Sequence, residues 1–266
     1  MAGTKKRNPT VQTVLRWIRA GYGQGEGSSF KPFMYVRDVP SEGTSSMVQS
    51  RITGRTHHYL SWGEFSVHLL AEYCRSIVDI REQYALLPWE ETQETAAKLG
   101  IKHPVIPSTD TPSVVTTDLL LSLKEPDGVR LVAVSVKLEK DLTPRTLEKL
   151  LLERMYWNRR GITWVLATDK NIPGIRTGNL RFFENSIRNQ DALRSGVDPE
   201  TFSRRFEQEW APKRPYIDIL RAACTEFNVD SNVGHGILGA AVWQRKTRLN
   251  IDHAPIEHKS YVALIE

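Results

Sequence analysis

The sequence predicts an α/β protein with a mixed sheet flanked by helices and a smaller helical C-terminal domain. Helical and strand patterns alternate between residues 61 and 168, which is typical of an α/β core. Two apolar runs, 116–123 and 129–137, flank the turn sequence Pro126-Asp127-Gly128 and predict a hairpin. The Pro-, Gly- and Asn-rich start of 171–196 marks a boundary, so we expect domains at 1–172 and 173–266.

Composition is that of an ordinary globular protein, with 40% hydrophobic and 25% charged residues among 266. No apolar run is long enough to span a bilayer, and no signal peptide is evident. Cys74 and Cys224 are too few for a disulfide framework, which favours a reducing, cytoplasmic setting. The net charge of +5 mildly favours a polyanionic partner. Basic pairs such as 159–160, 204–205 and 213–214 are individually more typical of solvated surfaces.

The first sixty residues contain few regular elements. Residues 1–9 form a basic tail, and apolar spacing predicts a helix over 11–20 that stops at Gly21. Four alternating glycines follow at 21–27. They do not match a dinucleotide-binding fingerprint, and we interpret them as a plain linker or as a flexible loop that approaches DNA phosphate. Residues 30–60 are predicted to be irregular or to form short strands.

A helix is predicted over 61–76, followed by a strand at 77–84, a helix at 89–99 and a connector at 101–105. Ser61 and Glu64 fit a capping box at the start of the first helix, which by itself explains the glutamate. A carboxylate in this first turn could equally hold a metal ion. After the hairpin, Thr143 and Pro144 begin a helix that ends at Gly161, and 162–168 is a buried strand.

The hairpin brings a carboxylate near an ammonium group. If Glu125 pairs with Gly128, Asp118 lies opposite Ser135, with Lys137 as its diagonal neighbour at roughly 7–8 Å. Alternation then predicts two faces. The core face carries Thr117, Leu119, Leu121, Leu123, Val132, Val134 and Val136; the other carries Asp118, Ser122, Ser135 and Lys137. A carboxylate could hold a hard cation there, and the lysine could orient water or stabilise phosphate charge. A plain surface ion pair is the alternative on spacing alone.

Beyond the boundary, helices are predicted over 198–210, 216–227 and 231–244, with Asp198 and Pro199 starting the first. Two short strands at 247–252 and 258–264 flank a turn at Ala254-Pro255. Helices followed by a two-stranded wing are typical of a winged helix, which binds DNA or protein.

Several sequence blocks, in the same order, resemble one family. The helix carboxylate followed by a hairpin ending Asp…x-x-Lys resembles the PD-(D/E)xK restriction-endonuclease-like nucleases. A closer resemblance is carried by the blocks 54–58, 79–84, 100–105, 117–118 and 146–150, together with Glu153-Arg154 and Tyr156-Trp157. Over about 21–168 the chain resembles the TnsA family, the endonuclease subunits of heteromeric Tn7-type bacterial transposases.

The resemblance implies a Mg²⁺-dependent endonuclease, with Mn²⁺ as a substitute, that cuts the 5′ strands at transposon ends during cut-and-paste transposition. It implies as partners transposon-end double-stranded DNA, a TnsB-type transposase, and a TnsC-type ATPase that contacts the C-terminal domain. The protein would be bacterial and nucleoid-associated.

The resemblance also implies the site residues. The catalytic triad maps onto Glu64, Asp118 and Lys137, with Glu64 and Asp118 as metal ligands. The family's (D/E)xK motif begins with an acid or amide, whereas this chain has Ser135, whose hydroxyl is a weaker ligand. We therefore expect the Val136 carbonyl, and also Glu153, to contribute to coordination. A non-catalytic DNA-binding or assembly subunit with a degenerate nuclease site is the alternative that Ser135 favours.

Overall fold

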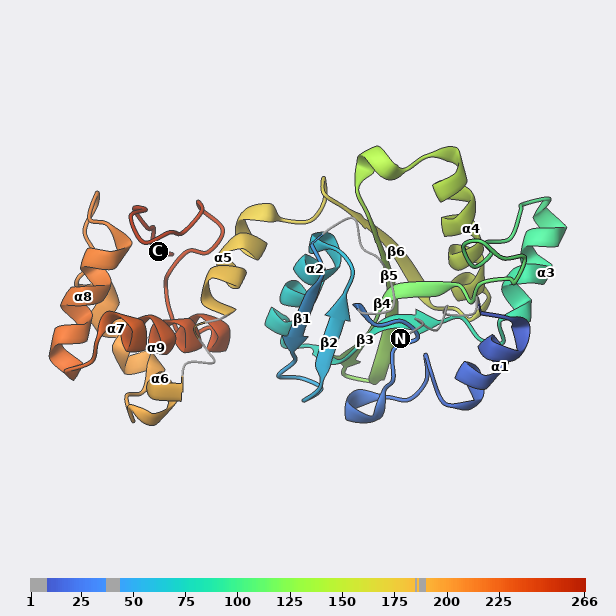
Figure 1. Ribbon diagram of the computed structural model, residues 1–266. Coiled ribbons are helices and arrows are strands. Elements are labelled where there is room, and N and C mark those ends of the chain that lie inside the picture. Colours follow the sequence, from blue (N-terminus) through green and yellow to red (C-terminus); the bar gives the residue numbers. More distant parts are fainter. Residues whose placement is uncertain (1–8, 37–43, 185, 187–189) are drawn as a thin grey trace, which may run out of the picture. The chain divides into compact units, whose positions relative to one another are not determined.

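The computed structural model describes residues 9–36, 44–184, 186 and 190–266, which divide into two compact units at Ile172/Pro173. Figure 1 shows the helices and strands of both units. The basic tail predicted for 1–9 lies outside the described residues except for Pro9. Among the described residues, no helix is both long and apolar enough to cross a membrane.

The N-terminal unit is built on a mixed sheet, as predicted, and this sheet has four strands. Its strands are β3 (Ile77–Ala85), β4 (Thr116–Glu125), β5 (Gly128–Lys137) and β6 (Thr163–Thr168), in the order β3-β4-β5-β6. β3, β4 and β5 pair antiparallel, and β5 and β6 pair parallel. The parallel pair is connected through the long helix α4 (Pro144–Arg159), because parallel neighbours need a crossover connection.

The β4–β5 hairpin has the predicted register, with Glu125 opposite Gly128. The prediction of a core face and a non-core face is wrong, because both faces are buried. Leu119 and Val134 are buried on one face, while Leu120 and Ala133 pack with Trp157 of α4 on the other. A strand covered on both sides does not need polar alternation.

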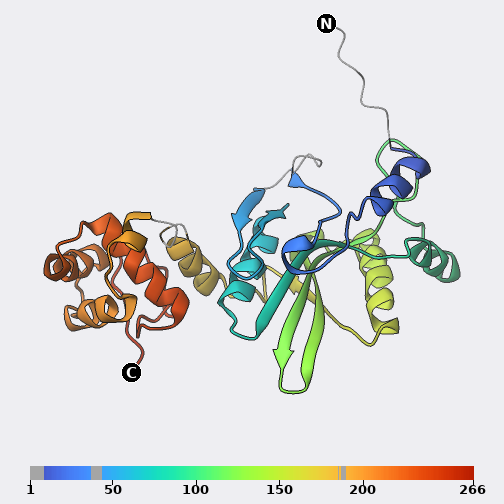
Figure 2. The ribbon, with the colours of Figure 1, turned by 90° about the horizontal axis from the view of Figure 1, so that it is seen from below.

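Two helices cover opposite faces of the sheet (Figure 1 and Figure 2). On one face lies α2 (Trp62–Tyr73), where Gly63 fits so closely against Val136 that an added Cβ would lie 2.8 Å from its Cγ1. On the other lies α4, capped as predicted by Thr143, whose hydroxyl accepts from the Thr146 amide. The sheet core is therefore held between α2 and α4.

The remaining elements of this unit are short. Helix α3 (Glu90–Leu99) packs on α4, and the ion pairs of Arg159 and Arg160 with Glu91 join them. The small sheet of β1 (Ser46–Gln49) and β2 (Thr56–Tyr59) confirms short strands in this region. The others are α1 (Val11–Arg19), η1 (Gly27–Ser29) and η3 (Glu139–Asp141).

The glycine run at 21–27 is a folded loop, not a plain linker. The Gly23 amide donates to the Lys31 carbonyl at 2.6 Å, and Gln24 forms a β-bridge with Lys31. The Gly27 amide donates to Asp79 of β3 at 3.2 Å. A Cβ at Gly23 would lie 2.2 Å from that of Ala85, so this glycine is required by a close contact between loop and strand.

The C-terminal unit consists of five helices in its described part, around α9 (Ser231–Gln244). The others are α5 (Gly174–Glu184), α6 (Gln190–Arg194), α7 (Pro199–Gln208) and α8 (Tyr216–Phe227). The prediction missed α5 and α6, which lie within the expected boundary region. The glycines of α9 allow close packing: a Cβ at Gly234 would lie 2.2 Å from the Cys224 sulfur.

The two wing strands predicted at 247–252 and 258–264 are not regular strands. The segments do lie antiparallel, through a single bridge between Leu249 and Leu264 and hydrogen bonds such as Asn250 N to Ala263 O at 2.8 Å. Turns at 251–253 and 258–259, where the two segments are connected, leave only a short stretch to pair, and a two-stranded ribbon has little stability of its own.

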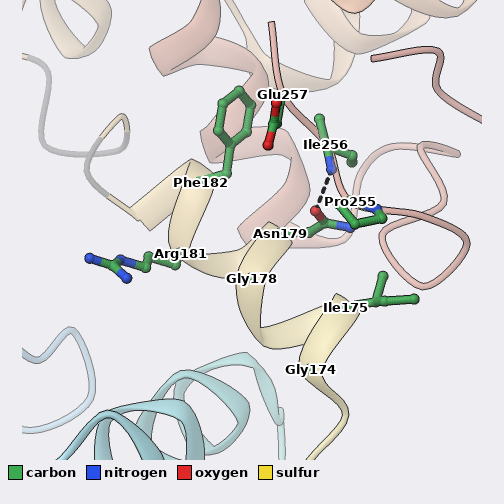
Figure 3. A pocket seen from close by; sticks show the side chains of 9 residues that line it. All are labelled: Gly174, Ile175, Gly178, Asn179, Arg181, Phe182, Pro255, Ile256 and Glu257. Carbon is green, nitrogen blue, oxygen red and sulfur yellow. Dashed lines mark hydrogen bonds between the residues drawn. The ribbon is translucent and has the colours of Figure 1, made fainter. Parts of the chain in front are cut away.

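A groove of about 530 Å³ lies in this unit between α5 and the segment 255–257 (Figure 3). Asn179 fixes its wall: its amide donates to the carbonyls of Ile251 and Ala254 and accepts from the Ile256 amide at 2.7 Å. The groove is therefore formed by α5, which lacks side-chain bulk at Gly174 and Gly178.

The packed glycine loop leads to a prediction about stability. Gly23→Ala is expected to lower the free energy of unfolding by roughly 1–3 kcal/mol more than Gly21→Ala, as measured by urea denaturation. Both residues have positive φ, 73° and 81°, but only a Cβ at Gly23 meets another atom within 4 Å. Equal losses in the two variants would show that the loop does not pack on Ala85.

Candidate active site

Asp118 and Lys137 meet at the open end of the hairpin, as predicted. The Lys137 ammonium lies 3.0 Å from Asp118 Oδ2 and donates to the Val136 carbonyl at 2.8 Å. The same Asp118 oxygen accepts from the Val136 amide at 2.7 Å. The ladder's last pair is Leu119 with Val134, so the Asp118 side chain continues the link between the strands where the ladder stops.

The Ser135 hydroxyl is directed at Glu153 and not at Asp118, its predicted neighbour on the same face. The hydroxyl donates to Glu153 at 2.5 Å and accepts from the Trp164 indole at 2.9 Å, and the residue is fully buried. Thr117, predicted for the opposite face, donates to Glu153 at 2.7 Å. Strand alternation is therefore broken between Leu119 and Thr117, and a regular two-residue period could not predict the result.

Glu64 lies in the first turn of α2 and is buried. It accepts from the Leu60 amide at 3.0 Å and from the Ser61 hydroxyl at 2.9 Å, and the Ser61 oxygen accepts from the Glu64 amide. The predicted cap is thus present, with the Leu60 amide as the donor to the carboxylate. The carboxylate also lies close enough to Asp118 for their charges to interact, so capping and a place in the site coexist.

Glu153 of α4 is buried behind the hairpin. Thr117 and Ser135 both donate to its Oε1. Burial, and then the charge of Asp118, raise the pKa of Glu153 from 4.5 to about 7, although the two hydroxyls and Lys137 act to lower it. Because hydroxyls from both β4 and β5 donate to the same oxygen, Glu153 supports the ends of these two strands.

The site carries more negative than positive charge. Burial, and then the charge of Asp118, raise the pKa of Glu64 from 4.5 to about 7. Burial lowers the pKa of Lys137, but Asp118 and the two glutamates more than offset this, and the pKa is raised overall. One ammonium group thus faces three carboxyl groups, an arrangement that attracts further positive charge.

A mixed sheet held between helices, with an acid and a lysine at its hairpin end, defines the restriction-endonuclease-like fold. Residues 74–169 match the family model of the TnsA-like endonuclease N-terminal domain. The chain is also 43% identical over 171 residues to the transposon Tn7 transposition protein TnsA of Escherichia coli. Residues 74–169, within the N-terminal unit, therefore match a TnsA-like endonuclease domain.

Both matches cover only part of the chain. The match with the Escherichia coli protein spans 64% of this chain and 61% of the relative's own length. The matched family segment includes Asp118, Lys137 and Glu153, whereas Glu64 precedes it.

The sequence reasoning missed one polar residue of the site, Gln83 of β3. It is buried, and its amide nitrogen donates to Glu64 at 3.4 Å. The signal available was the polar pair Glu82-Gln83 within an otherwise buried strand, since side chains on both sides of such a strand meet the interior. Arg55 bonds both oxygens of Glu82, which explains the first member of the pair as structural.

The raised pKa of Glu153 predicts a pH-dependent stability. The Glu153 carboxyl ionises near pH 4.5 in the unfolded chain and near pH 7 in the folded protein. Its contribution to the free energy of unfolding is therefore fully present below pH 4.5 and is lost as the pH rises through about 7. In Glu153→Gln the amide oxygen can still accept from both hydroxyls. The free energy of unfolding of this variant is expected to exceed that of wild type by a few kcal/mol at pH 8 and to equal it near pH 4.5.

Urea denaturation across this pH range measures the difference. Glu94→Gln, at an exposed position of α3, is the control and should follow wild type throughout. A constant difference between Glu153→Gln and wild type from pH 4.5 to 8 would contradict the prediction.

Proposed function

We propose that the protein is a metal-dependent DNA endonuclease that cuts the 5′ strands at transposon ends during cut-and-paste transposition. The observation that carries the proposal is the contact of Lys137 with Asp118 and the Val136 carbonyl beside buried Glu64. The similarity to a Tn7 transposition protein supports a role in transposition.

The oxygen donors of the site suit a small divalent cation. In the part of the chain that the structure describes, no three His, Cys, Asp or Glu side chains gather as a complete metal site. Mg²⁺ needs fewer protein ligands, because it keeps several waters and is usually held by one or two carboxylates. Asp118, Glu64 and the Val136 carbonyl would hold it, and the Lys137 ammonium already bridges two of these three groups.

Each residue has a proposed role. Asp118 and Glu64 would bind the cation through their carboxylates. Lys137, whose raised pKa keeps it an ammonium group, orients the attacking water and stabilises charge on the scissile phosphate. Mg²⁺, or Mn²⁺ in its place, would supply positive charge to that phosphate and make a water more acidic. We assign Ser135 and Glu153 to supporting the strand ends, because their hydrogen bonds are made to each other and to neighbours.

The substrate is double-stranded DNA at transposon ends, and the partners are a TnsB-type transposase and a TnsC-type ATPase. We propose that the C-terminal unit contacts the ATPase. Its predicted basic pairs are largely neutralised: Arg204 pairs with Glu200, Arg205 with Glu209 and Glu226, and Arg214 with Glu209. Paired charges attract phosphate less than free ones, which favours a protein partner over DNA for this surface.

One observation favours the alternative of a non-catalytic DNA-binding subunit. The hydroxyl of Ser135, at the position of the motif's acid or amide, bonds Glu153 and Trp164 and so adds no ligand to the cation. Such a subunit would bind DNA in a salt-dependent way without binding a divalent cation.

Cleavage of transposon-end DNA tests the proposal. With Mg²⁺ and both partner proteins present, Asp118→Ala and Lys137→Ala are each expected to lower 5′-strand cleavage by about 100-fold or more. Asp127→Asn, in the exposed hairpin turn, is the control and should cleave like wild type.

Wild-type cleavage by Asp118→Ala would contradict the site assignment. If calorimetric titration with Mn²⁺ gave no heat for wild type, while DNA binding survived in Asp118→Ala, the non-catalytic alternative would replace the nuclease.

A further inference from the structure

Gln83 has an unusual backbone for a strand residue. Its φ is +47°, within β3, where neighbouring residues are extended. A residue other than glycine in this region costs roughly 1–3 kcal/mol and persists only where its surroundings hold it. Its carbonyl accepts from the Phe33 amide at 3.1 Å, which fixes the backbone from outside the sheet.

The side chain of Gln83 links two elements of the site. Its Nε2 donates to Glu64 Oε2 at 3.4 Å, and its Oε1 accepts from the Thr116 hydroxyl at 3.1 Å. The partners determine the orientation of the amide, since an ionised carboxylate only accepts hydrogen bonds and the hydroxyl has a proton to donate. Thr116 therefore anchors the amide whose other end contacts Glu64.

The position of Gln83 in the sheet places this link beside the catalytic carboxylate. The pairs Glu82–Leu119 and Tyr84–Thr117 flank it, so Gln83 lies opposite Asp118. In a regular strand, adjacent side chains point to opposite faces. Here the positive φ turns the side chain of Gln83 toward α2. The neighbouring part of β4 also departs from regular alternation.

We propose that Gln83 is a positioning residue that holds the Glu64 carboxylate at a fixed place relative to Asp118, an inference that rests on the proposed nuclease function. The other donors to Glu64, the Leu60 amide and the Ser61 hydroxyl, belong to the start of its own helix. Gln83 supplies a donor from the sheet, where Asp118 is located. The two carboxylates come from separate elements, and Gln83 couples them.

Mn²⁺ titration of the full chain by calorimetry tests the inference. In Gln83→Asn the amide and the tolerance for positive φ are kept, but the side chain is one methylene too short to join Thr116 to Glu64. Its Mn²⁺ affinity is expected to fall about 10-fold or more, as for other residues that orient metal ligands. Gln93→Asn, the same change in α3, is the control and should bind Mn²⁺ like wild type.

A double-mutant cycle separates positioning from general stability. Thr116→Val removes the anchor of the amide without touching Glu64, and is expected to weaken Mn²⁺ binding less than Gln83→Asn does. If Thr116 acts through Gln83, the double variant binds no more weakly than Gln83→Asn alone. Additive losses would show that the two residues act separately and would overturn the inference.

The outcomes distinguish the two proposals. Wild type that binds Mn²⁺ while Gln83→Asn binds it equally well overturns the role of Gln83 and leaves the nuclease proposal standing. Wild type that binds no Mn²⁺ overturns both. If Gln83→Asn fails to fold, wild-type Mn²⁺ affinity in folded Thr116→Val overturns the inference, and weakened affinity supports it.

Discussion

The contact between Asp118 and Lys137 is the interaction on which the rest of the site depends, because it supplies the local compensation for a crowded negative charge. Glu64 approaches from α2 and Glu153 from α4, and the charge of Asp118 raises the pKa of both. Two helices on opposite faces of the sheet thus deliver carboxyl groups to one strand end. Carboxyl groups this close raise one another's pKa and together attract positive charge.

A local irregularity of the backbone makes this convergence possible. If β4 alternated regularly, Thr117 would face α2 and Asp118 would face α4. Instead Thr117 bonds Glu153 of α4, while Asp118 bonds the Val136 amide and Lys137. The positive φ of Gln83 lies at the same level of the sheet. Strain of this kind is found where function requires a geometry that regular structure does not provide.

The parts that could be predicted from the sequence are those set by local chemistry. The turn at Pro126-Asp127-Gly128 sets the hairpin register, and Thr143 with Pro144 sets the start of α4. The break in alternation could not be predicted, since it depends on contacts made across three elements. Helix α5 was missed because Gly174 and Gly178 disfavour a helix, which is stabilised by packing on α9.

A serine at position 135 and a buried glutamate at position 153 fit together, because the single ammonium group of the site limits how many carboxylates can lie there. An acid at position 135 would place a further carboxylate against Glu153, with the single ammonium of Lys137 already bonded to Asp118. A serine instead donates a hydrogen bond to Glu153 and accepts one from Trp164. It thus satisfies the buried Glu153 without adding a further charge. In the proposed nuclease, the oxygen ligands of the cation are therefore limited to Asp118, Glu64 and the Val136 carbonyl. With so few ligands, the orientation of Glu64 matters more.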